Sequence, residues 1–336
     1  MKDKIILGIE TSCDETAAAV LVNGRSVLAN VVSSQIPVHQ KFGGVVPEIA
    51  SRHHLENLPL VVDQALREAG LTFADLSAIA VTHGPGLVGA LLVGLSGAKA
   101  MAAAQGLPLI GVNHLEGHIY ANFLVKPDLE FPLLCLLVSG GHTHLLILRA
   151  HGKYSVLGQT RDDAAGEAFD KVARAMGLGY PGGPRIQEVS EGGNPSAIDL
   201  PRAWLEHDSL DFSFSGMKTA VLNYLNRAAQ RGEEVNKQDL AASFQQAVID
   251  VLVGKAIKAA KLNGVDTVVL AGGVAANRAL RLKLQAACAE AGKQLFVPPV
   301  ELCTDNAAMI ACAGYYKYLR GEVAAWDLNA IPGMSL

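Results

Sequence analysis

Two similar apolar segments, each interrupted by a short turn, constrain the fold of this chain more than any other feature. Residues 5–22 read IILGIETSCDETAAAVLV, and residues 131–148 read FPLLCLLVSGGHTHLLIL. Short apolar runs bounded by small and polar residues are typical of buried strands. We therefore predict that each half of the chain opens with a β-hairpin, and that the architecture is duplicated.

Strand and helix patterns alternate along the rest of the chain. Further strands are predicted at 26–34, 76–86, 107–113 and from 265, with the Asn23-Gly24 pair as a hairpin signal. Helices are predicted at 47–69, after 86, at 114–124, 162–177 and 238–262, from about 275, and after a cap at Thr304 or Asp305. This alternation is typical of an α/β fold.

Composition limits the classes of partner. The chain has 336 residues, half of them hydrophobic, which is enough for two domains. Its net charge of −4 excludes a global basic field, so any RNA contact is a local patch or comes through a partner. Five scattered cysteines without a CxxC pair indicate a reducing, cytoplasmic compartment. We interpret the apolar stretch 84–106, interrupted by Lys99, as a loop and a buried helix rather than a membrane span.

Residues 114–118 read HLEGH. On a helix, His114 and His118 project from one face, one turn apart, where a single metal ion can bind both imidazoles. The alternative is a solvated helix with two incidental histidines. Leu115 follows the first histidine, so the zinc-protease motif H-E-x-x-H is not matched. Asp305 either caps the last helix or adds a carboxylate to the two histidines, a set that suits Fe(II) or Zn(II).

Three turns that follow predicted strands can expose backbone N–H groups to phosphate oxygens: ETSCDET, VSGGHT and AGGVAANR. No P-loop motif occurs, and no GxGxxG follows the first strand. Asp14 and Glu15 in the first of these turns are either solvated or functional. In the functional interpretation they face phosphate and metal, or act as a general base.

Ten longer stretches carry a family resemblance: GIETSCDETAAAV, FGGVVPEIASRHH, THGPGLVGALLVG, NHLEGH, LLVSGGHTHL, DDAAGEAFDK, YPGGP, DFSFSGMKT, LAGGVAANR and CTDNAAMIA. In these stretches the chain resembles the TsaD family of tRNA N6-adenosine threonylcarbamoyltransferases, from about residue 5 to about residue 320. The resemblance implies a two-lobed sugar kinase/Hsp70/actin-like (ASKHA) fold. We expect the first lobe at 1–115 with 303–336, and the second at 116–302.

The resemblance also implies an activity and its partners. The threonylcarbamoyl group of threonylcarbamoyl-AMP would pass to N6 of adenosine 37, in tRNAs that read codons beginning with A, and AMP would leave. One Fe2+ per chain, with Zn2+ or Mg2+ as alternatives, would be held by His114, His118 and Asp305. The implied partners are tRNA, a TsaB-like subunit of the same fold and a TsaE-like P-loop ATPase.

Substrate-binding residues are implied in the second half of the chain: Leu137, Val138, Ser139, Gly140, Gly141, Asp170, Gly183, Gln187 and Asn277. The stretch 137–141 would contact the phosphate end of the substrate. Asp170 and Gly183 would contact the ribose side, and Asn277 the adenosine side. Asp14 or Glu15 would take the proton from the attacking amine.

Two positions depart from the family pattern. Leu137 stands where archaeal and eukaryotic relatives often have a metal-contacting tyrosine. Gln187 stands where many bacterial relatives have aspartate, although an amide oxygen can still accept a hydrogen bond from a hydroxyl. Three rival functions are a metalloprotease, a nucleotide-binding scaffold without enzymatic activity, and a sugar kinase, for which no catalytic aspartate is located.

Overall fold

The computed structural model describes residues 3–204 and 208–336, which form two units. The first unit comprises the chain up to Leu129 together with Pro298–Leu336, and the second is Glu130–Val297. The predicted boundaries at 115/116 and 302/303 differ from these. The reason is that helix α4 (His114–Val125) packs against α10 (Ala307–Leu319), and so belongs whole to the first unit.

The first sheet has the strand order β3-β2-β1-β4-β5. Its first three strands form an antiparallel meander: β1 (Ile5–Glu10), β2 (Glu15–Val22) and β3 (Ser26–Ser34). On the other side of β1, β4 (Ala78–Gly84) pairs parallel to it, and β5 (Leu109–Asn113) pairs parallel to β4. The carboxyl ends of β1, β4 and β5 therefore lie at one edge of the sheet.

The second sheet has the order β10-β9-β6-β7-β8. The strands β6 (Leu133–Val138), β7 (Thr143–Ala150) and β8 (Lys153–Gln159) form an antiparallel meander. The strands β9 (Thr267–Ala271) and β10 (Gln294–Phe296) extend the sheet in parallel from β6. The two sheets thus share one topology, which confirms the predicted duplication with a hairpin at the start of each half.

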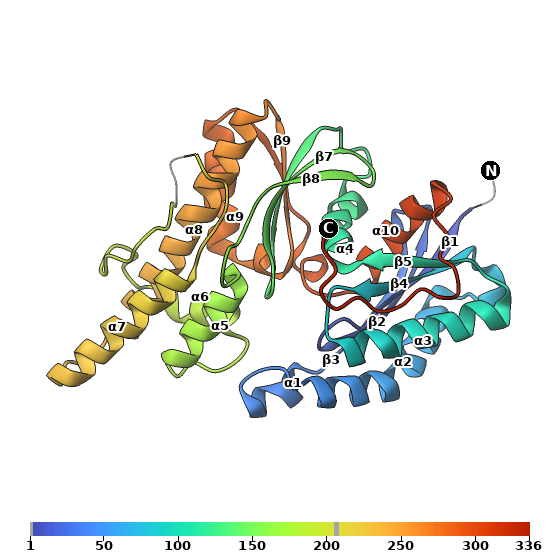
Figure 1. Ribbon diagram of the computed structural model, residues 1–336, viewed down its shortest axis with the longest axis horizontal. Helices are drawn as coiled ribbons and strands as arrows, with labels where there is room; N and C mark the ends of the chain where they lie inside the picture. Colours follow the sequence, from blue (N-terminus) through green and yellow to red (C-terminus); the bar gives the residue numbers. More distant parts are fainter. Residues whose placement is uncertain (1–2, 205–207) are drawn as a thin grey trace. The chain divides into compact units, whose positions relative to one another are not determined.

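The helices are divided between the two units (Figure 1). The first unit has α1 (Ile36–His39), η1 (Gln40–Phe42), α2 (Pro47–Ala69), η2 (Phe73–Asp75), α3 (Val88–Gln105), α4, η4 (Val300–Leu302) and α10. The second has α5 (Ala165–Ala175), α6 (Gly182–Ser190), α7 (Ser215–Arg231), α8 (Lys237–Leu262), η3 (Gly273–Ala276) and α9 (Arg278–Glu290). The sequence patterns did not predict α1, β8, α6, α7 or β10. The elements α1 and β10 have only four and three residues, β8 and α7 are largely exposed, and α6 begins inside the Gly- and Pro-rich YPGGP.

Small residues let α10 lie close against the first sheet. Ala17 and Ala19 of β2 pack on Ala307 and Ala308 of α10. A Cβ atom on Gly8 of β1 would lie 2.4 Å from the carbonyl oxygen of Ala307. The opposite face of the sheet is covered by α2 and α3 around a core of aliphatic residues. The start of α10 is therefore fixed beside the ends of the central strands.

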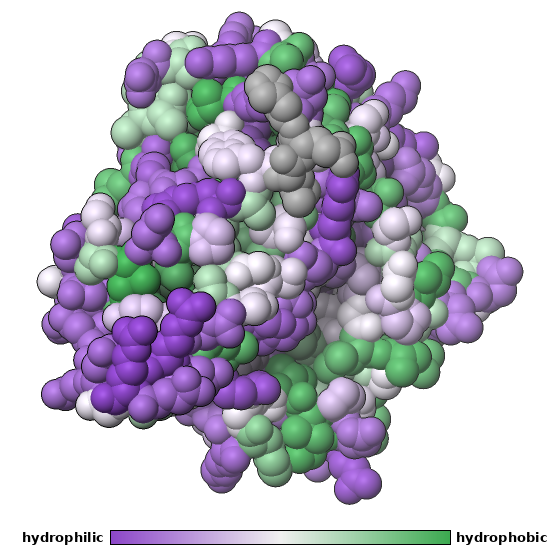
Figure 2. Space-filling view, turned by 60° about the vertical axis from the view of Figure 1, so that its left-hand side comes forward, coloured by the Kyte–Doolittle hydropathy of each residue, from purple (hydrophilic) through white to green (hydrophobic). Residues whose placement is uncertain are grey.

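Two helices, α3 and α8, are long and apolar enough to cross a membrane by length and composition alone. In α8, 78% of the apolar window is buried inside the fold. In α3, 33% of the window is buried, and the buried residues line the face that packs on β4 and α2. Both helices therefore serve as packing elements of their own units. The surface displayed in Figure 2 mixes hydrophilic areas with small hydrophobic ones.

Candidate functional site

The HLEGH motif forms the first turn of α4. Asn113, at the end of β5, caps this helix, because its Oδ1 accepts hydrogen bonds from the N–H groups of Leu115 at 2.8 Å and Glu116 at 3.4 Å. The cap makes His114 the first helical residue. The rings of His114 and His118 consequently lie on one face of α4, with centroids 4.7 Å apart.

Asp305 reaches the same place from the start of α10. The predicted cap at Thr304 or Asp305 is wrong, because Asn306 caps α10 by accepting a hydrogen bond from the Met309 N–H at 3.0 Å.

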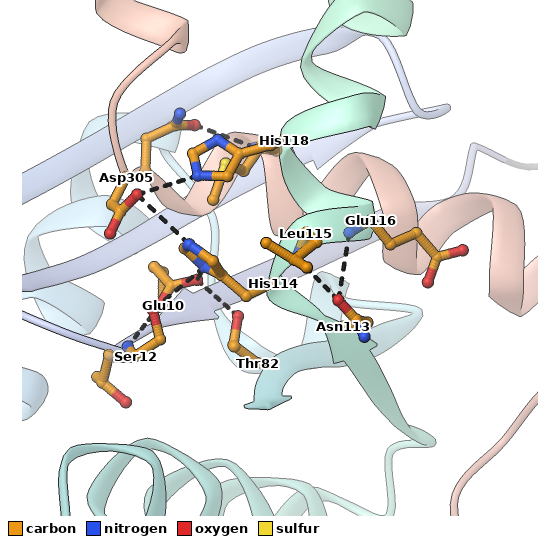
Figure 3. Close-up of polar contacts among 12 residues, drawn as sticks. Glu10, Ser12, Thr82, Asn113, His114, Leu115, Glu116, His118 and Asp305 are labelled. Carbon is orange, nitrogen blue, oxygen red and sulfur yellow. Dashed lines mark hydrogen bonds and ion pairs between the residues drawn. The ribbon is translucent and has the colours of Figure 1, made fainter. Parts of the chain in front are cut away.

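The Asp305 carboxylate instead faces the two imidazoles (Figure 3). Its Oδ1 lies 3.5 Å from Nε2 of His114 and 3.2 Å from Nε2 of His118. One ligand atom from each of the three residues lies within 4.8 Å of the others, so the group can hold a metal ion.

The surroundings of His118 fit a metal ligand. The residue is 1% exposed, and neither of its ring nitrogens makes a well-aligned hydrogen bond to the described residues, although Nε2 lies 3.2 Å from Oδ1 of Asp305. A buried polar atom without a partner costs free energy, so such atoms usually have one. A cation beside Nε2 would remove this cost for that nitrogen. Two imidazoles with one carboxylate also match the donors that Fe(II) and Zn(II) prefer.

The charges of the group also favour a cation. Burial by itself would lower the pKa of His114, but the carboxylates of Asp305 and Glu10 outweigh it and raise that pKa to about 9. Burial lowers the pKa of His118. Burial opposes ionisation of Asp305, yet the two histidines hold the pKa of this carboxyl below its usual value. At neutral pH an entering cation must therefore displace one proton, that of His114.

Two of the three residues between the histidines, Glu116 and Gly117, attach α4 to α10. Glu116 is buried and points away from the histidines, with its Oε2 3.4 Å from Nζ of Lys317 (Figure 3). A Cβ atom on Gly117 would lie 2.6 Å from Cδ1 of Ile310. Glu116 and Gly117 are therefore packing positions, and only the histidines of the motif face Asp305.

Asp14 and Glu15 lie where the β1–β2 turn leads into β2. The backbone carbonyl of Asp14 accepts a hydrogen bond from the Gln35 N–H at 2.9 Å, and the Glu15 carboxyl accepts one from the Ser34 hydroxyl at 2.9 Å. Burial and the nearby carboxylates of Asp305 and Asp14 raise the pKa of Glu15 to about 10. Without a bound cation, this raised pKa favours the neutral acid at neutral pH, a form that can donate a hydrogen bond but cannot serve as a base.

The β6–β7 hairpin of the second unit carries the predicted phosphate contacts. Leu137 and Val138 end β6 with fully buried side chains, so only their backbone can meet a ligand. The N–H of Ser139 donates to the carbonyl of His142 at 2.8 Å, and the Ser139 hydroxyl accepts from the His142 N–H at 3.2 Å. Residues 140–141 are exposed at the tip of this turn.

The close backbone approach in this region is made by other glycines. A Cβ atom at either position of 140–141 would meet nothing within 4 Å. On Gly166 of α5 it would lie 2.5 Å from the carbonyl oxygen of Ser139. On Gly272, where φ is +90°, it would lie 2.4 Å from the carbonyl oxygen of Val138. Gly166 and Gly272 therefore support the turn, while its tip stays open.

Three of the remaining predicted residues lie on α5 and α6. Asp170 of α5 accepts a hydrogen bond from the Gly182 N–H at 2.6 Å, which joins α5 to the start of α6 beside Gly183. Gln187 of α6 accepts one from the Arg278 N–H at 2.7 Å. Gln187 thus links α6 to the first turn of α9.

Asn277 is the cap of α9. Its Oδ1 accepts a hydrogen bond from the Leu280 N–H at 2.9 Å, and its Nδ2 donates to Oε1 of Gln245 at 2.7 Å. Gln245 in turn donates to the Ser190 hydroxyl at 3.0 Å. Gln245 could not be predicted from the sequence, because a glutamine within a long apolar helix carries no signal of its own.

The family model and the relatives that match this chain agree on one family. The family model described as "TsaD: tRNA N6-adenosine threonylcarbamoyltransferase" matches residues 26–312. The tRNA N6-adenosine threonylcarbamoyltransferase of Desulfitobacterium hafniense (strain Y51) is 64% identical over 335 residues, which cover 100% of this chain and 98% of the relative. The protein of the same name from Moorella thermoacetica (strain ATCC 39073 / JCM 9320) is 61% identical, with 98% of this chain and 97% of the relative covered.

Solved structures similar to this chain show the fold. HypF from T. kodakarensis has a TM-score of 0.62 and 16% identity, with 97% of this chain and 49% of that chain covered. Full-length HypF in the phosphate- and nucleotide-bound form has a TM-score of 0.61 and 15% identity, with 96% and 47% covered. These similarities confirm the predicted sugar kinase/Hsp70/actin-like fold.

Proposed function

The chain belongs to the family of tRNA N6-adenosine threonylcarbamoyltransferases, and from this premise we propose its donor, its target base and its metal dependence. It transfers the threonylcarbamoyl group of threonylcarbamoyl-AMP to N6 of adenosine 37, in tRNAs that read codons beginning with A, and releases AMP. The observation that carries the metal dependence is the convergence of His114, His118 and Asp305.

We assign these three residues as ligands of one Fe2+ per chain, with Zn2+ or Mg2+ as alternatives. Three protein ligands are the number that catalytic sites commonly use while leaving a position for substrate. When bound, the ion would supply Lewis-acid polarisation of a threonylcarbamoyl or phosphate oxygen. The donor set supports this assignment, because the buried His118 has its Nε2 3.2 Å from the Asp305 carboxylate without a well-aligned hydrogen bond between them.

The proposed catalytic carboxyl groups lie where the β1–β2 turn of the first unit leads into β2. The exocyclic amine of adenine is a weak nucleophile, so positioning contributes more than outright deprotonation. Asp14 is the carboxylate that would accept the proton released from N6. Glu15, whose pKa is raised to about 10 by burial and by the carboxylates of Asp305 and Asp14, would donate a hydrogen bond instead.

The second unit would bind the adenylate part of the donor. In the stretch 137–141, the N–H groups exposed at 140–141 would meet the phosphate, since exposed turn amides suit anions. Asp170 and Gly183 would contact the ribose, and Asn277 the adenine side. Gln187 would approach the ribose through its amide, whose Oε1 is already bonded to the start of α9.

The proposed partners follow from the proposed activity and from the net charge of the chain. A chain of net charge −4 would share the capture of tRNA with other subunits. We propose a TsaB-like subunit of the same fold and a TsaE-like P-loop ATPase for this role, in the cytoplasm. A peptidase function is not favoured, because Glu116 faces Lys317 rather than the two histidines.

A transfer assay tests the proposal. The purified chain, its proposed partners, threonylcarbamoyl-AMP and tRNA are combined, and the tRNA nucleosides are analysed by mass spectrometry. We expect threonylcarbamoyl-adenosine with the wild type and with the control His53→Ala, a histidine on α2, but not with His114→Ala. No product from the wild type with active partners would refute the function. Product formation by His114→Ala would support the transfer activity but refute the assignment of a metal ion to this site.

A further inference from the structure

A fully buried glutamate stands behind the first histidine of the candidate metal centre. Glu10 is the last residue of β1 and is 0% exposed. Its Oε2 lies 2.9 Å from Nδ1 of His114 and accepts a hydrogen bond from the Thr82 hydroxyl at 2.7 Å (Figure 3). Its Oε1 accepts one from the Ser12 N–H. Glu10 is therefore fixed by groups from the β1–β2 turn, β4 and α4.

These contacts select one form of the His114 ring. A carboxylate only accepts hydrogen bonds, so Nδ1 of His114 must carry the proton that it shares with Glu10. In the neutral ring, Nε2 then has a free lone pair, and this is the atom that lies 3.5 Å from Asp305. The Ser12 hydroxyl, 3.1 Å from Nδ1, can donate or accept and so selects neither form.

We infer that Glu10 is a positioning residue that holds His114 in the Nδ1–H form, with Nε2 directed to the metal. This inference rests on the proposed metal site and deepens it. His118 has no such support among the described residues, so the two histidine ligands differ. Loss of a carboxylate that orients a metal-bound histidine typically costs about 10- to 100-fold in metal affinity.

The variant Glu10→Gln keeps the volume of the side chain but breaks this arrangement in either orientation. If the NH2 group faces His114, the ring must accept at Nδ1 and carry its proton on Nε2, which blocks metal binding. If the NH2 group faces Ser12, two N–H donors oppose each other where a hydrogen bond now exists. Neither orientation reproduces the three donors that converge on Glu10.

The test measures Zn2+ binding, by competition with a chelating dye, for the wild type, Glu10→Gln and Glu116→Gln. Glu116 is a matched control, because it is also a buried glutamate of the first unit but faces Lys317 instead of a histidine. We expect the dissociation constant to rise about 10- to 100-fold for Glu10→Gln. We expect it to stay within about twofold for Glu116→Gln, with circular dichroism showing that both variants are folded.

A second measurement does not depend on the folding of a variant. Nitrogen-15 NMR of histidine-labelled wild-type chain loaded with Zn2+ should show His114 protonated at Nδ1 and metal-bound at Nε2. The opposite form, or equal Zn2+ affinity of wild type and Glu10→Gln, would overturn the inference and leave the proposed function standing. Equal weakening in both glutamate variants would also overturn it, because the effect would then be general. A wild-type chain that binds no Zn2+ would overturn the metal site itself.

Discussion

The two units share one sheet topology, but the turns at equivalent positions of that topology carry different chemical groups. In the first unit, Gly86 follows β4 and approaches the turn after β1, where a Cβ atom would lie 2.5 Å from the Ser12 carbonyl oxygen. In the second, Gly272 follows β9 and approaches the end of β6, where a Cβ atom would lie 2.4 Å from the Val138 carbonyl oxygen. Both glycines have positive φ, so the close approach is a repeated feature of the fold.

The side chains at these repeated turns differ in charge. The first unit buries Glu10 beside His114 and adds Asp305 from the segment just before α10, which gives a centre for a cation. The second unit has no acidic residue between Val138 and Thr143, and it presents serine and glycine there. The shared topology thus determines where a ligand can bind, and the turn residues determine whether it is a cation or an anion.

The largest effect is expected for His118→Ala in the first unit. Loss of a direct ligand should reduce metal affinity and transfer activity by more than about 100-fold, beyond the range for supporting residues. His144→Ala on β7, in the second unit, should keep the wild-type metal content. The measurement is elemental analysis of dialysed protein together with product formation. Similar metal loss in the two variants would contradict the prediction that only the first unit supplies the metal ligands.

The shared glycines should be equally intolerant of a side chain. Gly86→Ala and Gly272→Ala should each lower the free energy of unfolding by about 2 kcal/mol, because a Cβ atom meets a backbone carbonyl at positive φ. Gly141→Ala, with nothing within 4 Å of the added carbon, should change it by less than about 0.5 kcal/mol. Urea unfolding measures all three. A Gly272→Ala variant as stable as Gly141→Ala would contradict the structural equivalence of Gly86 and Gly272.

Metal binding by the first unit should depend on pH. The pKa of His114, about 9 without a bound cation, means that the ring is protonated at neutral pH and must lose a proton when metal binds. Below that pKa, the apparent affinity should fall about tenfold for each unit of pH, since one proton competes with one ion. Zn2+ titrations between neutral pH and pH 9 measure the slope, and an affinity independent of pH would contradict the charge state deduced for His114.

The smallest effect concerns Gln187 in the second unit. Gln187→Ala removes the acceptor for the first N–H of α9 and should cost about 1 kcal/mol of unfolding free energy. Gln187→Glu keeps an acceptor and adds negative charge at a helix N-terminus, so it should be at least as stable as the wild type. Chemical unfolding of both variants tests this role, and an Ala variant as stable as the Glu variant would refute it.

Local patterns predicted the parts of the fold that depend on neighbouring residues. The spacing within HLEGH placed His114 and His118 on one helical face, and the two apolar hairpins indicated the duplicated sheets. The third member of the centre is different, because Asp305 meets the histidines only through the packing of α10 on α4. Spacing along the chain could not select it, and Asn306, its neighbour, turned out to be the helix cap.

Glu10 illustrates why other residues around the site could not be predicted from the sequence. It ends an apolar run and resembles an ordinary residue at the edge of a turn. Its partners Thr82 and His114 come from separate strand and helix segments, so only the folded sheet brings them together. Gln245 was missed for a similar reason, because its contact with Asn277 depends on how α8 and α9 pack.

The proposed function requires one ion, held by His114, His118 and Asp305, for threonylcarbamoyl transfer. The most direct test removes bound metal with a chelator, returns Fe2+ anaerobically in steps, and measures bound iron and product at each step. We predict that product formation rises in proportion to bound iron and stops rising at one ion per chain. Full activity of the metal-free chain, in the presence of its partners, would contradict this requirement.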